Sequence, residues 1–304
     1  MTRAVQQFLW PDAQWGRTLR PAERVVNVAS VPQRSPLRYP GGKTWLVPDI
    51  RTWLEGLPYR VEAFVEPFAG GAIASLTAIF DGLADRAVMC ELDAQLAALW
   101  QLILTDADWL IDRILSFPMT SEEVKSVLER QPETLRERGF ATLLANRVHR
   151  GGILARGSSR MKRGENGKGI GSRWYPETLA RRIREIHARR DQITFVHGNG
   201  LDLLREYAGH PSAAFFVDPP YTAGGKKAGR RLYTHNDLDH PALFATLGEV
   251  VGGFLMTYDD AGEVLAMAHR QGFAVRRVPM KNTHHAKQYE LLITPSWYRW
   301  PDRA

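Results

Sequence analysis

The sequence has very little cysteine and no long apolar run. Its 304 residues include one cysteine, Cys90, which excludes a disulfide within the chain and leaves no set of thiolates for a metal cluster. Nine histidines remain as candidate ligands, but His284 and His285 are adjacent rather than at ligand spacing, and we expect no metal site. No apolar stretch approaches the ~18 residues of a membrane span. The first ten residues have no basic region followed by an apolar core, so we expect an intracellular, cytoplasmic protein.

The net charge of +7 is concentrated in one region. Residues 146–190 contain thirteen basic and three acidic side chains, so this segment carries +10 and the rest of the chain carries −3. Glycines, Trp174 and Tyr175 are interleaved with these charges, which favours contact with nucleic acid, although a solvated loop and helix would have the same composition. The predicted DNA contacts are Arg147, Arg150, Arg156, Arg160, Lys162, Arg163, Lys168 and Arg173.

The stretch 215–221 combines a short apolar strand with an abrupt stop. The strand ends at Asp218, and Pro219 and Pro220 then exclude both helix and further strand pairing. This order puts the Asp218 carboxylate at the carboxyl end of a strand, where open α/β sheets bind ligands, with Tyr221 three residues on. A carboxylate, a fixed carbonyl and a ring suit a planar base that carries an amino group. The alternative is a plain strand end followed by a proline turn.

A second motif predicts a nucleotide-binding turn. A predicted strand ends at Glu66, and the sequence Pro-Phe-Ala-Gly-Gly, with Phe68 and Gly70, leads into an apolar helix. The next predicted strand ends at Glu91, which lies 21 residues beyond Gly70, where such units place the acid that binds ribose hydroxyls. We therefore expect an adenosine-containing cofactor. The other role open to Glu91 is a cap for the helix that begins near Asp93.

Residues 37–44 contain a glycine turn before a lysine. The Gly-Lys-Thr at its end is like a phosphate-binding loop, but that loop needs a glycine five residues before its second glycine, and position 37 is leucine. No hydrophobic strand precedes the segment. We therefore expect a turn that holds Tyr39 and Lys43 close to an exposed backbone around Gly42, followed by a helix over 45–54.

The order of the apolar patterns predicts an α/β fold with a mainly helical insert. Residues 1–35 form an extension without clear periodicity, and residues 94–190 form a helical and basic-loop insert between the two parts of a sheet domain, 36–93 and 191–304. The last two strands are expected to form an edge hairpin. The expected strands are 63–66, 87–90, 193–196, 215–217, 253–257, 275–278 and 291–294.

Five stretches then follow one another along the chain. They are Leu-Arg-Tyr-Pro-Gly-Gly-Lys at 37–43, Phe-Val-Glu-Pro-Phe-Ala-Gly-Gly at 64–71, Asp-Pro-Pro-Tyr at 218–221, Tyr-Thr-His-Asn-Asp-Leu-Asp-His at 233–240 and Glu-Leu-Leu-Ile-Thr at 290–294. Together they resemble the ordered motifs of the Dam-like (alpha-class) DNA adenine-N6 methyltransferases. The resemblance implies S-adenosylmethionine as methyl donor, a Rossmann-like methyltransferase sheet whose last strand is antiparallel, and a target-recognition insert. It also implies a bacterial or phage-type protein that acts on double-stranded DNA, and it allows a cognate restriction enzyme as partner.

The resemblance also implies roles for single residues. By position in the motifs, the cofactor contacts are Tyr39, Gly42, Lys43, Glu66, Phe68, Gly70, Glu91 and Asp218, and the catalytic residues are Asp218, Pro219, Pro220 and Tyr221. The insert departs from the family pattern at 146–152, so the recognised DNA sequence is not predicted.

The chemistry of adenine agrees with the Asp-Pro-Pro-Tyr stretch. The amino nitrogen is a poor nucleophile because its lone pair is delocalised into the ring, so Asp218 and the Pro219 carbonyl are expected to accept its hydrogens while the methyl group is held in line. The base cannot reach such a pocket inside a duplex, so it must flip out, and Tyr221 is expected to stack on it. The alternatives are methylation of RNA adenine or of a protein amide nitrogen, and a relative that binds DNA without catalysis.

Overall fold

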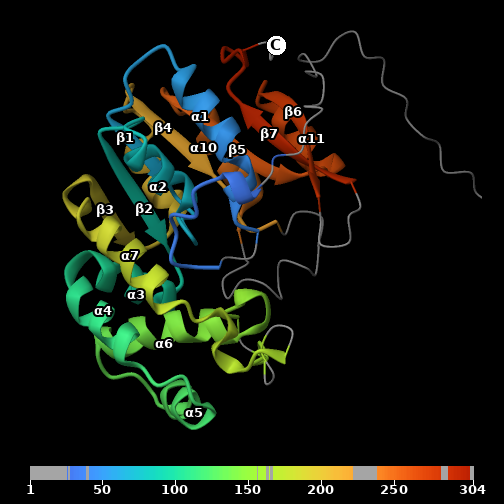
Figure 1. The fold of residues 1–304 in the computed structure, drawn as a ribbon. Helices are drawn as coiled ribbons and strands as arrows, with labels where there is room; N and C mark the ends of the chain where they lie inside the picture. Colours follow the sequence, from blue (N-terminus) through green and yellow to red (C-terminus); the bar gives the residue numbers. More distant parts are fainter. Residues whose placement is uncertain are drawn as a thin grey trace, which may run out of the picture.

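The computed structural model describes residues 26, 28–38, 41–155, 157–161, 164, 167–221, 238–281 and 287–301. Its seven-stranded sheet has the order β3-β2-β1-β4-β5-β7-β6 (Figure 1). Neighbouring strands are parallel except for β7, which is antiparallel to both β5 and β6. This arrangement confirms the predicted α/β class, the antiparallel last strand and the edge hairpin. The strands are β1 (Ala63–Glu66), β2 (Arg86–Glu91), β3 (Ile193–His197), β4 (Ala213–Val217), β5 (Gly253–Asp259), β6 (Ala274–Lys281) and β7 (Lys287–Thr294).

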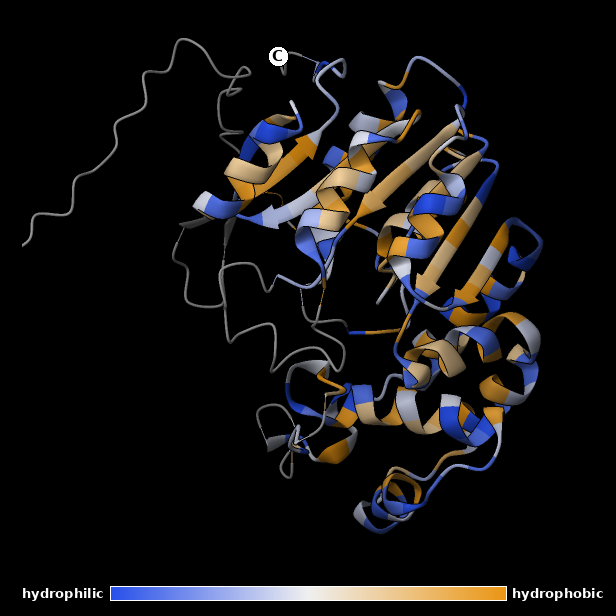
Figure 2. Ribbon diagram, turned by 180° about the vertical axis from the view of Figure 1, so that it is seen from behind, coloured by the Kyte–Doolittle hydropathy of each residue, from blue (hydrophilic) through white to orange (hydrophobic). Residues whose placement is uncertain are grey.

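Helices cover both faces of the central strands. Successive strand residues point to opposite faces. In β1, Phe64 packs with the cluster under α1 and α2, whereas Val65 belongs to the cluster under α8, α10 and α11. β1 and β4 are buried along their whole length. Parallel strands covered on both faces carry mainly apolar residues, and the strands of the sheet are mostly hydrophobic in Figure 2. These helices are α1 (Val47–Glu55), α2 (Ile73–Phe80), α8 (Gly200–Tyr207), α10 (His240–Gly248) and α11 (Gly262–Arg270).

The described part of the predicted insert is helical and packs onto the β2–β3 side of the sheet (Figure 1). Its α-helices are α3 (Ala94–Thr105), α4 (Ala107–Ser116), α5 (Ser121–Glu129), α6 (Leu135–Val148) and α7 (Pro176–His187). Trp100 of α3, Phe140 of α6 and Ile183 of α7 belong to the same hydrophobic cluster as Met89 of β2 and Ile193 of β3. The helices therefore share a core with the sheet, and the boundaries of a separate domain at 94 and 190 stay a prediction.

The helical region expected after residue 94 consists of several separate helices, and particular residues mark the breaks between them. Asp106 stands between α3 and α4, and Pro118 and Pro132 stand in the breaks after α4 and α5, where proline cannot continue a helix. At the start of α6, Thr134 and Glu137 form a capping box, in which each side chain accepts from the other residue's backbone N–H.

Three helical features differ from the sequence predictions. The helix expected over 45–54 starts as a 3₁₀ turn (η2, Lys43–Leu46) before α1. The basic sequence at the end of the insert predicts a helix over 176–190, but α7 ends at His187. The sequence analysis also missed α10, which begins after Asp239, whose side chain accepts from the backbone N–H of Ala242 at 2.9 Å. No described helix has both the length and the apolar character needed to cross a membrane.

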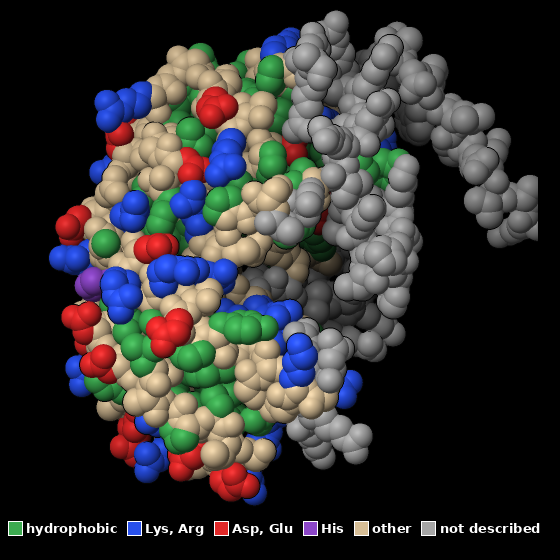
Figure 3. Space-filling model, viewed as in Figure 1, with side chains coloured by type: hydrophobic (Ala, Val, Ile, Leu, Met, Phe, Trp, Pro, Cys, Tyr) green, Lys and Arg blue, Asp and Glu red, His purple; other side chains and the backbone are tan. Residues whose placement is uncertain are grey.

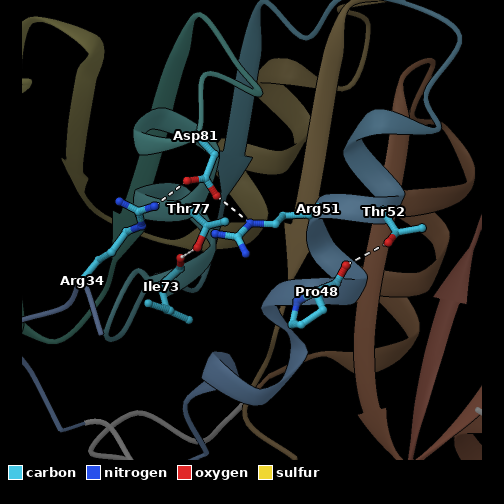
Figure 4. A network of polar contacts seen from close by, with 7 residues as sticks. All are labelled: Arg34, Pro48, Arg51, Thr52, Ile73, Thr77 and Asp81. Carbon is cyan, nitrogen blue, oxygen red and sulfur yellow. Dashed lines mark hydrogen bonds and ion pairs between the residues drawn. The ribbon is translucent and has the colours of Figure 1, made fainter. Parts of the chain in front are cut away.

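The segment 28–38 runs along α1 and α2 toward the carboxyl ends of the strands. Val31 packs there with residues of α1 and α2, behind the short 3₁₀ turn Val28–Ser30. Arg34 and Arg51 both contact the carboxylate of Asp81 at the end of α2, the latter with 2.7 Å between Nε and Oδ2 (Figure 4). This part of the predicted extension is thus fastened to the sheet domain. Residues 1–25, including Trp10 and Trp15, lie outside the described residues.

Candidate functional site

A cavity of about 910 Å³ opens at the carboxyl ends of β1, β2 and β4. The strand order reverses between β1 and β4, and open α/β sheets bind ligands at such a switch point. Figure 3 shows a hollow on this face with Lys and Arg side chains near its rim. The wall includes seven of the predicted cofactor and catalytic residues, namely Gly42, Lys43, Glu66, Phe68, Glu91, Asp218 and Pro220. Tertiary structure thus joins the three sequence motifs in one place, which we call the central cavity.

The turn after β1 is held in an unusual backbone conformation. Gly70 has φ 47° and Ala72, which precedes α2, has φ 52°. Left-handed backbone is costly for alanine, so neighbouring contacts must hold it. Ala69 donates its N–H to the Cys90 carbonyl at 2.9 Å, and Trp100 donates its ring N–H to the Gly70 carbonyl at 2.9 Å. β2 and α3 therefore fix the turn and keep its backbone at the cavity.

Gly200 is a close neighbour of this turn that the sequence analysis did not single out. A Cβ at position 200 would lie 2.2 Å from the carbonyl oxygen of Pro67, so only glycine lets α8 start this close. The signal available in sequence was the Gly-Asn-Gly that follows β3.

Glu91 joins the end of β2 to the glycine turn. Its Oε2 accepts from the Gly70 N–H at 3.1 Å, and its Oε1 accepts from the N–H groups of Leu92 at 2.9 Å and Asp93 at 3.0 Å. Burial raises the pKa of Glu91 to about 7, and the neighbouring Asp93 adds to this shift. The helix α3 is capped by Asp93 itself, whose Oδ1 accepts from Gln95 at 2.8 Å, so the alternative role of Glu91 as helix cap is wrong. Oε1 already accepts two hydrogen bonds and Oε2 accepts one, so one lone-pair site of Oε2 remains for a ribose hydroxyl.

Glu66 lies deeper in the same wall, with 3% of its surface exposed. Its Oε2 accepts from the N–H of Ser75 in the first turn of α2 at 2.9 Å. Burial raises the pKa of Glu66 to about 8, despite the opposing hydrogen bond from Ser75. Glu66 therefore supports the start of α2, while Phe68, half-buried, contributes an apolar surface to the cavity.

Asp218 is the centre of a buried polar network. Its Oδ1 accepts from Tyr221 Oη at 2.9 Å and from Thr257 Oγ1 at 2.7 Å, and it lies 2.9 Å from Lys43 Nζ. Glu290 of β7 lies 3.7 Å from the same ammonium group, and burial raises its pKa to about 7 while Lys43 opposes the shift. In the described structure every hydrogen bond to this carboxylate goes to Oδ1, so Oδ2 can accept from a ligand.

Tyr221 has a different environment from the one that base stacking requires. Its ring stacks on Tyr258 at 5.2 Å between centroids, and Lys43 Nζ lies 5.0 Å from the same ring centroid. Tyr258 in turn contacts His240 Nδ1 through its hydroxyl. Stacking of Tyr221 on a base would therefore need a rearrangement of these contacts, and its predicted role stays a prediction.

Two network members were not predicted as site residues. Glu290 occurred only in a resembling motif, and Thr257 only as the end of a predicted strand. The available signal was topological. Thr257 is near the carboxyl end of β5, which is parallel to β4, and Glu290 is in the first half of β7, which is antiparallel to β5, so both lie toward the same edge of the sheet. Tyr39, a predicted donor contact, lies outside the described residues.

The predicted DNA contacts do not share one surface. Arg150 and Lys168 are exposed, and Arg160 is half-buried with its guanidinium 3.8 Å from Glu129. Arg147 and Arg173 are buried, so these two predicted DNA contacts do not lie on the outer surface of the segment. The last turn of α6 points inward, so Arg147 lines the central cavity. Arg156, Lys162 and Arg163 lie outside the described residues.

Asn146, beside Arg147, connects two motifs. Its side chain accepts from the Arg38 N–H at 2.9 Å and donates to the carbonyls of Arg38 at 2.9 Å and Gly152 at 2.8 Å. This fully buried amide therefore fixes the segment before the Gly-Gly-Lys turn against the start of the basic loop.

Among the described residues, no group of three or more histidine, cysteine or acidic side chains could hold a metal ion.

The sheet has one antiparallel strand, and its cavity lies at the switch point of the strand order, where such sheets bind ligands. This is a Rossmann-like methyltransferase fold. Residues 39–146 match the family model of the D12 class N6 adenine-specific DNA methyltransferases. This match confirms the resemblance to Dam-like enzymes over a segment that includes the glycine turn and Glu91. The fold and this match together indicate methyltransferase chemistry, which requires a methyl donor.

Comparisons with curated proteins and with solved structures say less about this chain. No curated protein matches the sequence. Among solved structures, the rRNA methyltransferase aviRa from Streptomyces viridochromogenes has a TM-score of 0.46 and 13% identity, with 91% of this chain and 96% of that chain covered. A precorrin-6y C5,15-methyltransferase from Geobacter metallireducens has a TM-score of 0.33 and 10% identity, with 81% and 85% covered. Matches this distant say nothing about the substrate of this chain.

Proposed function

We propose that this protein is a site-specific DNA adenine methyltransferase that transfers a methyl group from S-adenosylmethionine to the exocyclic amino nitrogen of an adenine flipped out of duplex DNA. The observation that carries the proposal is that one cavity contains both the Glu66–Ala72 turn with Glu91 and the Asp218 carboxylate. A nucleoside-type donor and an amino-bearing base can therefore meet there. The matched family model supports adenine in DNA as the acceptor.

The residues at the strand ends fit the donor. Glu91 has one lone-pair site of Oε2 left for a ribose hydroxyl, Phe68 offers an apolar face, and the fixed Gly70 turn allows a ligand close to the backbone. Gly42 and Lys43 line the side of the cavity that leads to Asp218. The donor would supply an electrophilic methyl group.

Asp218 is suited to hold the adenine amino group. Lys43, Tyr221 and Thr257 all contact Oδ1, which restricts rotation of the carboxylate and leaves Oδ2 to accept one amino hydrogen. The Pro219 carbonyl, with its backbone restrained by two prolines, would accept the other. Two fixed acceptors orient the nitrogen lone pair toward the methyl group, which is the main catalytic contribution expected of preorganised groups.

The DNA-binding part of the proposal depends on the charge of residues 146–190. This segment carries +10, and cationic segments bind DNA mainly through phosphates. An adenine inside a duplex cannot reach a carboxylate that is only 22% exposed, so the base must leave the helix. A cognate restriction enzyme is compatible with this function.

The deciding experiment is methyl transfer in vitro. Purified protein is incubated with methyl-labelled S-adenosylmethionine and, separately, duplex DNA, structured RNA and unfolded protein, and the DNA is then digested to nucleosides. We expect label in duplex DNA as N6-methyladenine. Label in RNA, in protein or in methylcytosine would refute the proposal, and so would absence of transfer by protein that binds both donor and DNA. Methylation-sensitive long-read sequencing of DNA from expressing cells would then identify the target sequence.

A further inference from the structure

Three side chains of the basic segment line the central cavity with increasing exposure, and the proposed transfer step uses none of them. Arg147 is 4% exposed, Arg182 is half-buried, and Tyr175 is 55% exposed. They come from the end of α6, from α7 and from the residue before α7. We call these three residues the arginine–tyrosine wall. It lies opposite the strand ends that supply Glu66, Glu91 and Asp218, and it leads from the interior of the cavity to solvent.

The two guanidinium groups of the wall donate to backbone carbonyls. Burial and Arg181 lower the pKa of Arg182, and the nearby Glu185 opposes this shift. Arg182 Nη1 donates to the Ser35 carbonyl at 2.9 Å, and Arg147 donates to the Pro36 carbonyl. Neither forms an ion pair with a carboxylate in the part of the chain that the structure describes. The buried Nε of Arg147 has no hydrogen-bond partner there. A guanidinium has five N–H donors, so two carbonyls leave most of this donor capacity unused.

An uncompensated cation is costly to bury, which points to an anionic ligand. Burial lowers the pKa of Arg147 to about 9, and Arg182 and Arg38 lower it further because all three are cations. An anion between Arg147 and Arg182 would relieve this repulsion. Guanidinium groups bind phosphate oxygens in pairs of parallel hydrogen bonds, which favours phosphate as the ligand.

The exposed ring of Tyr175 favours nucleic acid over the donor as the source of that anion. A large aromatic side chain that is 55% exposed beside two cations resembles the sites that bind single strands, where bases stack on rings and phosphates bind arginines. S-adenosylmethionine contains a sulfonium, an ammonium and one carboxylate, so its net charge is positive and it gains little from two further cations. The carboxylates on the opposite wall suit it better.

We propose that the arginine–tyrosine wall is a nucleotide subsite, in which Arg147 and Arg182 hold one phosphate of the DNA strand and Tyr175 stacks on a base beside the extruded adenine. This inference rests on the proposed function, because it takes DNA as the substrate. It adds two residues, Tyr175 and Arg182, that neither the motifs nor the charge count had assigned to a site. It also assigns Arg147 a phosphate inside the cavity rather than on the outer surface of the insert.

The charge part of the proposal is tested with Arg182→Met, which leaves the more buried Arg147 in place. Fluorescence anisotropy with a labelled duplex gives affinity at several salt concentrations. The matched control is Arg184→Met, which removes the same charge from an exposed position of the same helix that does not line the cavity. We expect Arg182→Met to weaken binding about tenfold and to reduce the slope of log affinity against log salt by about 0.9. Arg184→Met should stay within about twofold. Equal effects of the two substitutions would overturn the subsite.

The stacking part is tested at Tyr175. Tyr175→Leu should weaken binding about tenfold without changing the salt slope, because stacking releases no counterions. Tyr175→Phe, which keeps the ring, should bind within about twofold of wild type. Equal losses in the two variants would contradict stacking. Circular dichroism and thermal unfolding establish that each variant is folded before its affinity is compared.

A donor titration separates this inference from the proposed function. Calorimetry with S-adenosylmethionine should give the same affinity for wild type and Arg182→Met, and a tenfold loss of donor binding with unchanged DNA binding would overturn the subsite. If wild type methylates DNA but the wall variants bind DNA normally, the subsite alone fails. If wild type binds DNA through the wall but transfers no methyl group to it, the proposed function alone fails. Wild type that binds no DNA at low salt would refute both.

Discussion

Lys43 Nζ lies 2.9 Å from Asp218 Oδ1, with 3% of the lysine side chain exposed. The ammonium group also lies 3.7 Å from Glu290 Oε1, so one buried cation serves two carboxylates from different strands. Breaking a buried pair leaves an uncompensated charge, whereas an exposed pair contributes little. The contact therefore connects the Gly-Gly-Lys turn, the end of β4 and β7, and it gives the lysine a structural role in addition to its proposed contact with the donor.

Lys43→Met tests this role. The substitution removes the cation and leaves Asp218 and Glu290 without it, so the free energy of unfolding should fall by roughly 3–5 kcal/mol. Methyl transfer should fall about a hundredfold or more, because Asp218 loses a contact that orients it. Urea unfolding and the transfer assay measure the two effects.

The control for that substitution is Lys125→Met. Lys125 is 62% exposed and lies 3.9 Å from Glu129 one helical turn away. Its loss should change stability by less than about 1 kcal/mol. A Lys43→Met variant as stable as the Lys125→Met variant would show that the buried pair contributes nothing to the fold.

Asp218→Ala should abolish methyl transfer while donor affinity stays within about tenfold. In the proposed function Asp218 faces the base, whereas the donor is expected to contact Lys43, the Gly70 turn and Glu91. The loss should therefore fall on turnover rather than on donor binding. Transfer rates and calorimetry with the donor check the two parts. As control, Asp202→Ala removes an exposed carboxylate paired with Arg205 at 2.9 Å and should leave the rate unchanged. Retention of more than about a tenth of the wild-type rate by Asp218→Ala would exclude its assigned role.

Glu91→Gln should weaken donor binding roughly ten- to a hundredfold, because a charge-assisted bond to a ribose hydroxyl is worth about 1.5–3 kcal/mol. Affinity for DNA should not change. Calorimetry with the donor measures the loss, and an unchanged affinity would mean that Glu91 only supports the turn through Gly70.

The same residue predicts a pH dependence. Burial raises the pKa of Glu91 to about 7, and hydroxyl donors favour the ionised form, so donor binding should release a proton. Donor affinity of wild type should therefore rise between about pH 6 and pH 8. In Glu91→Gln this rise should be absent, and parallel pH profiles for the two proteins would assign the dependence to another group.

Glu66 predicts how stability depends on pH. Its pKa rises from 4.5 to about 8 in the folded protein because the side chain is buried. Between these values the folded state binds a proton that the unfolded state has lost, so stability should fall with increasing pH by up to about 1.4 kcal/mol per unit. Below pH 4.5 both states hold the proton, and above about pH 8 neither does.

Glu66→Gln isolates this contribution. The amide oxygen can still accept from Ser75, but it cannot ionise, so the variant should gain on the order of a few kcal/mol relative to wild type between pH 5 and pH 8. Urea unfolding of both proteins at the two pH values measures the difference. Glu91 and Glu290, whose pKa values burial also raises, are present in both proteins and cancel. A difference that does not change with pH would contradict the prediction.

Replacement of Arg160, Lys162 and Arg163 together by alanine should flatten the salt dependence of DNA binding by up to about three charge units, since each neutralised phosphate contributes a slope of roughly 0.9. Donor binding should not change. The measurement is log affinity against log salt on one duplex. A matched variant that replaces the exposed Arg60, Arg205 and Arg270 removes equal charge outside the segment. Equal slopes for this control and the test variant would mean that the loop is only solvated.

The sequence by itself determined the parts of this protein that depend on residues close together in the chain. The strand, glycine turn and helix at 63–80 follow from an apolar run, two glycines and a helical pattern, and β1 and α2 have the predicted bounds. Asp218 stands at the end of β4 because two prolines cannot continue a strand. The parallel sheet follows from alternation of strands and helices, and the antiparallel last strand was implied by family resemblance.

Only the tertiary structure decided which side chains meet. Thr257 meets Asp218 because β5 lies beside β4, and Glu290 reaches the Lys43 ammonium group because β7 lies beside β5. No local pattern specifies these pairings. Arg147 belonged to the same charge count as the exposed Arg150, yet it is buried because the last turn of α6 faces the cavity. A count of basic residues does not say which way each side chain points, whereas the packing of a helix does. Spacing along the chain therefore predicted the chemistry at the strand ends, and the packing of α6 and α7 determined which cations face it.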